Sequence, residues 1–124
     1  MPEAPFPAGY PLRGEIYTVD FNPARGSEQA GIRPAVVVSG ELNNRHSPVV
    51  VVAAMSSKVS KKKYPQNVYV PAGPLPQEGV ILGNQLTTID KTRLLEYRGM
   101  LDPATIELLD RSLALNLGSC QLGT

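Results

Sequence analysis

The chain has 124 residues, of which 42% are hydrophobic and 19% charged, and its formal net charge is +1 at pH 7. A domain of this length buries about two-thirds of the surface that its unfolded chain exposes, so one core can form without disulfides or a structural metal. The single cysteine, Cys120, excludes an internal disulfide and any site built from several thiolates, and it fits a reducing compartment.

The first twelve residues contain four prolines and no periodic apolar pattern. We therefore expect residues 1–12 to be a flexible arm, 13–118 to form one domain and 119–124 to be a tail. No stretch approaches the roughly 20 apolar residues of a membrane span, and the N-terminus lacks the basic and then apolar pattern of a signal peptide. The sequence thus predicts a cytoplasmic protein with no membrane contact.

Five segments with β patterns follow one another along the chain. Residues 14–21 alternate with the period of a half-buried strand. Residues 33–40 and 47–57 are short apolar runs, which is typical of strands buried on both faces. Residues 66–73 and 79–90 supply two more β segments, separated by proline and glycine turns.

The period changes only in residues 101–119. Asp102 can cap a helix, Pro103 suits its first position, and Gly118 can end it. Four apolar residues fall at helical spacing on one face: Ile106, Leu109, Leu113 and Leu117. The sequence therefore predicts a mainly β fold with a C-terminal helix, in which a small antiparallel β-barrel or strongly curved sheet carries the helix.

Positive charge is concentrated in the first half of the chain. Residues 13–63 hold eight lysines and arginines against four acids, whereas residues 64–124 hold four against six. The loop 57–66 alone carries four lysines: Lys58, Lys61, Lys62 and Lys63. Such a run fits a solvated hairpin loop, and it also fits a loop that contacts phosphates without regard to sequence.

Several common catalytic machineries are missing from the sequence. It has no glycine-rich phosphate loop and no cluster of His, Asp and Glu at the spacing of metal ligands. His46 is the only histidine, which excludes a ribonuclease that uses two histidines as acid and base. Because polar residues surround it in 41–48, we expect His46 to lie in a surface turn.

The remaining candidate catalytic residues include one arginine at the start of a predicted strand. Arg33 directly precedes Pro34 and an apolar run, and Ser56 stands near the end of the next apolar run. The loop before the arginine carries three further polar candidates: Ser27, Glu28 and Gln29. An arginine between a loop and a strand can meet an anion, although an ion pair with Glu28 and an ordinary strand-end hydroxyl at Ser56 are the plainer interpretations.

The stretch "RGEIYTVDFNPARGSEQAGIRPAVVVS" closely resembles the first two strands of the MazF/PemK toxins, which are sequence-specific endoribonucleases of bacterial toxin–antitoxin pairs. "NNRHSPVVVVAAMSS" and "NQLTTIDKTRL" are similar to later segments of that family, and the resemblance runs in order over residues 13–117. It implies an SH3-like barrel that acts as a homodimer on single-stranded mRNA with no metal or other cofactor. It also implies neutralisation by an antitoxin with an acidic, disordered tail.

The resemblance assigns roles to individual positions. The active-site arginine of the family falls on Arg33, its strand-end threonine on Ser56, and the glutamate of its "GSEQ" motif on Glu28. The glutamine before "TIDK" falls on Gln85, which could also be an amide that satisfies a turn. Relatives often carry an arginine where this chain has Thr87, so the resemblance does not imply that the same bases are recognised.

The implied chemistry agrees with the residue types. RNA can be cleaved without a metal when a 2'-OH attacks the adjacent phosphate, leaving a 2',3'-cyclic phosphate and a 5'-OH. Arg33 offers a permanently charged donor fork for the phosphate oxygens. A guanidinium that stays protonated is a poor base, so Glu28 is the better base candidate. Ser56 would orient the phosphate.

Two other functions fit the same fold. A gyrase poison of the CcdB type relies on an aromatic residue at its C-terminal tip, whereas this chain lacks tryptophan and ends "SCQLGT". A noncatalytic SH3-like module that binds RNA or protein would keep the barrel without needing Arg33 and Ser56 together.

Overall fold

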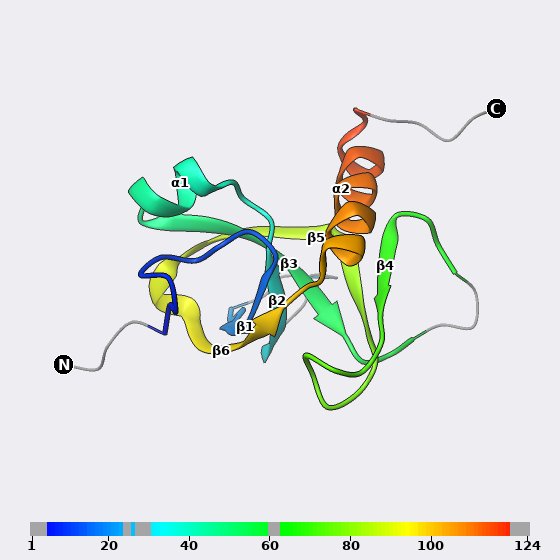
Figure 1. Cartoon of the computed structure of the whole chain (residues 1–124), viewed down its shortest axis with the longest axis horizontal. Helices are drawn as coiled ribbons and strands as arrows, with labels where there is room; N and C mark the ends of the chain where they lie inside the picture. The colour runs from blue at the N-terminus through cyan, green and yellow to red at the C-terminus, as the bar shows by residue number, and fades with distance from the viewer. Residues whose placement is uncertain (1–4, 24–25, 27–30, 60–62, 120–124) are drawn as a thin grey trace.

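Six antiparallel strands form one sheet in the computed structural model, which describes residues 5–23, 26, 31–59 and 63–119 (Figure 1). The strands are β1 (Glu15–Asp20), β2 (Ile32–Val37), β3 (Val49–Ser56), β4 (Asn67–Val70), β5 (Gly79–Asp90) and β6 (Leu94–Met100). The helices are α1 (Glu41–His46), the short 3-10 helix η1 (Lys91–Arg93) and α2 (Pro103–Leu117).

The sheet is open, with the strand order β4-β5-β3-β2-β1-β6, so β4 and β6 are its edges. The predicted class, mainly β with a C-terminal helix, is confirmed, but the sheet is not closed into a complete barrel. β5 is 12 residues long and pairs with β3 as well as with β4. It thereby links the β4 side of the molecule to the side that holds β1, β2 and β6 (Figure 1).

Two apolar clusters lie on opposite faces of the sheet because neighbouring side chains in a strand alternate. Val36 belongs to the cluster that includes Leu109 and Leu113 of α2, whereas Val37, the next residue of β2, belongs to the other. Both valines are fully buried, as are Val50 and Val52 of β3. The prediction that these two apolar runs form strands buried on both faces is therefore confirmed.

The predicted signals at both ends of α2 are present. Asp102 caps the helix by accepting a hydrogen bond from the backbone N–H of Thr105 at 2.8 Å, and Gly118 ends it in the left-handed conformation at φ 80°. Hydrogen bonds from the Thr105 side chain and backbone hold the pKa of Asp102 below its ordinary value, so the cap is charged at neutral pH. Within the described part of the chain, no helix has the length and apolar character that crossing a membrane requires.

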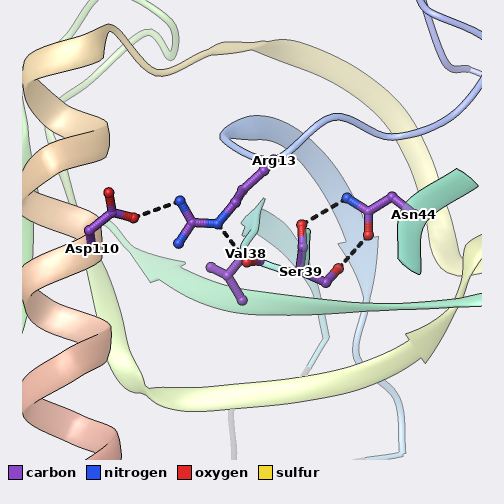
Figure 2. A network of polar contacts seen from close by, with 5 residues as sticks. All are labelled: Arg13, Val38, Ser39, Asn44 and Asp110. Atoms are coloured by element: carbon purple, nitrogen blue, oxygen red, sulfur yellow. Dashed lines mark hydrogen bonds and ion pairs between the residues drawn. The ribbon is translucent and has the colours of Figure 1, made fainter. Parts of the chain in front are cut away.

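Polar side chains fasten α1 and α2 to the region after β2 (Figure 2). Arg13 donates from Nε to the carbonyl of Val38 at 2.8 Å and pairs through Nη1 with Asp110 of α2 at 2.6 Å. Asn44 of α1 is fully buried, donating to the Ser39 carbonyl at 2.8 Å and accepting from the Ser39 hydroxyl at 2.6 Å. The segment expected to be only a surface turn is thus a short helix with a buried anchor.

The described part of the predicted N-terminal arm, residues 5–12, packs against the sheet and α1. The ring of Phe6 meets the ring of Tyr17 edge-on, with 5.8 Å between the centroids. The hydroxyl of Tyr10 donates to the Glu41 carboxylate at 2.7 Å. The expectation that this stretch stands outside the fold is therefore wrong for these residues, while the boundaries of the domain and of the C-terminal tail stay predictions.

Gly83 of β5 lies where α2 approaches the sheet most closely. A Cβ there would overlap Ser112 Oγ and would lie 2.5 Å from both Asn116 Nδ2 and the Gln66 carbonyl oxygen. These atoms are already hydrogen-bonded to one another, because the Ser112 hydroxyl and Asn116 Nδ2 both donate to that carbonyl.

We therefore expect Gly83→Ala to lower the free energy of unfolding by about 1–3 kcal/mol, which a shift in the urea midpoint would measure. Gly40→Ala is the matched control, because a Cβ at Gly40 meets nothing within 4 Å. Equal destabilisation by the two substitutions would contradict the close approach of α2 at Gly83.

Candidate active site

A pocket of about 370 Å³ opens at the end of the sheet where β2 begins and β3 ends. Among the described residues, the two strands and the residue after β3 contribute Arg33, Pro34, Met55, Ser56 and Ser57. The other described lining residues come from the loop 71–78, the first residue of β5 and one residue of β6: Leu75, Pro76, Gln77, Glu78, Gly79 and Arg98. The pocket thus combines two guanidinium groups and hydroxyls with an apolar wall.

The register of the sheet explains why Arg33 and Ser56 share this pocket. β2 and β3 are antiparallel, with Ala35 opposite Ala54 and Val36 opposite Ala53. Continuing this register by two residues brings Arg33 level with Ser56, and both side chains are half-buried. The structure therefore brings together the two residues that the sequence places at separate strand ends. Their roles stay predictions.

The Ser56 hydroxyl is held by the turn that follows β3. Its Oγ accepts a hydrogen bond from the backbone N–H of Lys58 at 3.1 Å. A serine hydroxyl has one donor proton and two acceptor lone pairs, so this bond leaves the O–H proton available for a substrate oxygen. The arrangement suits a group that orients a phosphate.

Five predicted site residues lie outside the described residues: Ser27, Glu28, Gln29, Lys61 and Lys62. The other two predicted lysines are described and exposed. Lys58 lies two residues beyond Ser56, whereas Lys63 lines a different pocket between β4 and α2, with its Nζ 3.9 Å from the centroid of the Tyr69 ring. Lys63 therefore does not join Arg33 in its pocket.

Gln85 is half-buried in β5, and the described lining of the Arg33 pocket does not include it. Thr87, two residues further along, lines a separate pocket of about 330 Å³ with Asp90 and Arg93. Hydrogen bonds from the backbone and side chain of Thr92 hold the pKa of Asp90 below its ordinary value. This second pocket therefore carries a negative charge beside Arg93 at neutral pH.

His46 is exposed at the last position of α1 and does not line the Arg33 pocket. The expectation of a surface histidine is confirmed, although the residue ends a helix. Over the part of the chain that the structure describes, no group of three or more His, Cys, Asp and Glu side chains is placed to hold a metal ion.

The sequence did not indicate four polar residues of the pocket lining: Ser57, Gln77, Glu78 and Arg98. Arg98 occupies an irregularity of β6, because Ile16 of β1 pairs with Gly99 while Tyr17 pairs with Tyr97, which leaves Arg98 as the extra residue. A β-bulge of this kind redirects a side chain, and a glycine within a strand often marks one. Gly99 is therefore the sequence signal that could have pointed to Arg98.

Comparisons with known proteins concern the family and the fold of the chain. A family model described as PemK-like, MazF-like toxin of type II toxin-antitoxin system matches residues 12–117. An endoribonuclease from a mycobacterial species is 29% identical, with 87% of this chain and 91% of that chain covered and a TM-score of 0.72. A mycobacterial endoribonuclease in complex with its cognate antitoxin is 29% identical, with 90% and 99% covered and a TM-score of 0.75. MazF from Deinococcus radiodurans is 28% identical, with 88% and 97% covered and a TM-score of 0.76.

Proposed function

The chain belongs to the PemK-like, MazF-like family of toxins from type II toxin–antitoxin systems, and we propose that it is an endoribonuclease that cleaves single-stranded mRNA in the Arg33–Ser56 pocket. The observation that carries this proposal is the meeting of Arg33 and Ser56 in one pocket from the ends of adjacent strands. Mycobacterial endoribonucleases with the same fold add support.

Arg33 stabilises the charge that builds up on the phosphate during cleavage. The 2'-OH of the RNA attacks its own phosphorus, the P–O5' bond breaks, and the two equatorial oxygens carry negative charge in the pentacoordinate state. A guanidinium donates two parallel hydrogen bonds to such oxygens and remains charged throughout. The products are a 2',3'-cyclic phosphate and a 5'-OH, and no metal ion takes part.

A proton must leave the 2'-OH, and another must reach the departing O5'. Arg33 is a poor proton acceptor because a guanidinium in a protein is effectively always protonated. We assign the base that removes the 2'-OH proton to Glu28, the glutamate of the "GSEQ" motif, and solvent water supplies the proton that O5' takes up. Ser56 has the task of donating to a phosphate oxygen. The bond that Ser56 accepts from the Lys58 backbone fixes its oxygen for that purpose.

The substrate and the partners follow from the same assignment. RNA without secondary structure is preferred, because its base edges are exposed and can be read in a sequence-specific way. The loop lysines Lys58, Lys61, Lys62 and Lys63, together with Ser27, Gln29 and Gln85, are proposed RNA contacts. The protein acts in the cytoplasm as a homodimer, and an acidic MazE-like antitoxin neutralises it. A related endoribonuclease is found in complex with its cognate antitoxin.

Substitutions at Ser56 test the role of its hydroxyl. We expect Ser56→Ala to lower the cleavage rate by about tenfold, because a phosphate hydrogen bond is lost, and Ser56→Thr to remain active because the hydroxyl is retained. Initial rates on one single-stranded RNA measure both variants. If the threonine variant were as slow as the alanine variant, Ser56 would be a packing residue.

Incubation of the purified protein with a long single-stranded RNA tests the proposed function as a whole. A nuclease produces discrete fragments, whereas a noncatalytic module leaves the RNA intact even when it binds. A gyrase poison leaves the RNA intact and acts on gyrase. A duplex of the same sequence is the control, and we expect it to resist cleavage.

A further inference from the structure

Arg98 of β6 lines the same pocket as Arg33 of β2. In the strand order β3-β2-β1-β6, β6 is two strands from β2, which is about 10 Å at the usual spacing of a sheet. Both arginines nevertheless line the same pocket. The pocket is therefore lined by two arginines that come from different strands of the sheet.

The backbone around Arg98 holds it against the loop wall of the pocket. Gly99, the next residue, has a φ of 143°, a conformation that favours glycine. A Cβ on Gly99 would lie 3.4 Å from the Cβ of Pro74, so the loop 71–78 packs directly on this point of β6. The bulge and this contact together direct Arg98 into the pocket instead of along the edge of the sheet.

The described partner of Arg98 does not compete strongly for its charge. Glu96 lies 3.6 Å away, measured from Nη1 to Oε2, and its side chain is 68% exposed. Exposed ion pairs of this kind contribute little to stability, so the guanidinium can turn to a phosphate at small cost. The one carboxylate among the described lining residues, Glu78, is exposed on the loop.

We propose that Arg98 binds the phosphate next to the one that is cleaved, so that the pocket holds one nucleotide of the RNA strand between Arg33 and Arg98. Every internal nucleotide of an RNA strand has a phosphate on each side, and the pocket is lined by two arginines from strands that lie two positions apart in the sheet. The apolar wall, which includes Pro34, Leu75 and Pro76, offers a surface for the base between them. This inference rests on the proposed function.

Because the neighbouring phosphate does not change during the reaction, Arg98 contributes equally to the ground state and the transition state. We expect Arg98→Ala to raise KM about five- to tenfold and to leave kcat nearly unchanged. The same variant should bind RNA with a shallower salt dependence, the slope of log K against log salt falling by about 0.7 for one lost phosphate contact. The pattern of cut sites should stay the same, because phosphate contacts do not read sequence.

Steady-state kinetics on a single-stranded RNA with one mapped cut site would test this, together with binding of the same RNA carrying deoxyribose at that site. Arg45→Ala is the matched control, because Arg45 is also an arginine with an exposed glutamate partner, Glu41 at 4.0 Å, but belongs to α1 outside the pocket. Thermal unfolding confirms that each variant is folded, and Arg98→Gln takes the place of the alanine variant if that one is not.

The outcomes separate this inference from the proposed function. A raised KM and a shallower salt slope in the Arg98 variant, with neither change in the Arg45 variant, support the assignment. An unchanged KM and slope would overturn it, as would a loss confined to kcat, which would place Arg98 at the cleaved phosphate. If the unmodified protein cleaved no RNA, the proposed function itself would fall, whatever the Arg98 variant did.

Discussion

RNA in which the ribose at the cut site is replaced by deoxyribose will bind the protein without being cleaved. The attacking nucleophile in the proposed reaction is the 2'-OH of the substrate, so its removal leaves no reaction path, and cleavage should fall below detection. Binding should persist because the contacts proposed for Arg33 and Arg98 are to phosphates, which the substitution leaves in place. Gel electrophoresis measures cleavage, and fluorescence anisotropy measures binding.

An oligonucleotide with deoxyribose several positions from the cut site is the control for this experiment, and it should be cleaved at the normal rate. Cleavage should also survive EDTA and His46→Ala, because the proposed chemistry uses neither a metal nor histidine. Cleavage at the substituted position would show that the 2'-OH is not the nucleophile. A product with a 5'-phosphate would point to attack by water instead.

Arg33→Ala should reduce kcat by about 10² to 10³, the usual cost of removing a donor that stabilises transition-state charge. The fold should survive because the fully buried part of β2 begins at Ala35, two residues further on. RNA binding should weaken much less than cleavage, since the charge on the phosphate oxygens grows only in the transition state. Single-turnover rates and the dissociation constant of the uncleavable RNA measure the two effects.

Arg45→Ala again controls for the loss of one positive charge and should cleave at the normal rate. Arg33→Lys should recover only part of the activity, because an ammonium group lacks the planar donor fork of a guanidinium. Near-normal cleavage by Arg33→Ala would show that the reaction takes place elsewhere.

Strands with a strong apolar signal could be predicted from the sequence, whereas the edge strand β6 could not. β2 and β3 lie inside the sheet with apolar neighbours on both faces, so their sequences are nearly continuous apolar runs. β6 is an edge strand in which only Leu94 is buried, so it has no alternation to detect. α1 has one buried residue, Asn44, whose amide is satisfied by Ser39, and no apolar stripe indicates such a helix.

The residues of the candidate site also differ in whether the sequence alone could indicate them. Arg33 and Ser56 could be named from the sequence because each stands at the end of an apolar run and matches a family motif. For Arg98 the sequence offers only Gly99 as a sign of a bulge, because the position of Arg98 depends on how β6 pairs with β1, more than 75 residues earlier in the chain. Glu78 and Gln77 join the site only because the loop 71–78 folds against β6 at Gly99.

The most direct test of the proposed function is the chemical nature of the ends that the protein leaves on RNA. Purified protein is incubated in EDTA with an unstructured single-stranded RNA, and the fragments are identified by mass spectrometry. We expect discrete fragments with 2',3'-cyclic phosphate and 5'-OH ends, and no such fragments from the Arg33→Ala variant prepared in the same way. Intact RNA, fragments with 5'-phosphates, or the same fragments from both proteins would contradict the proposal that this pocket is a metal-independent ribonuclease site.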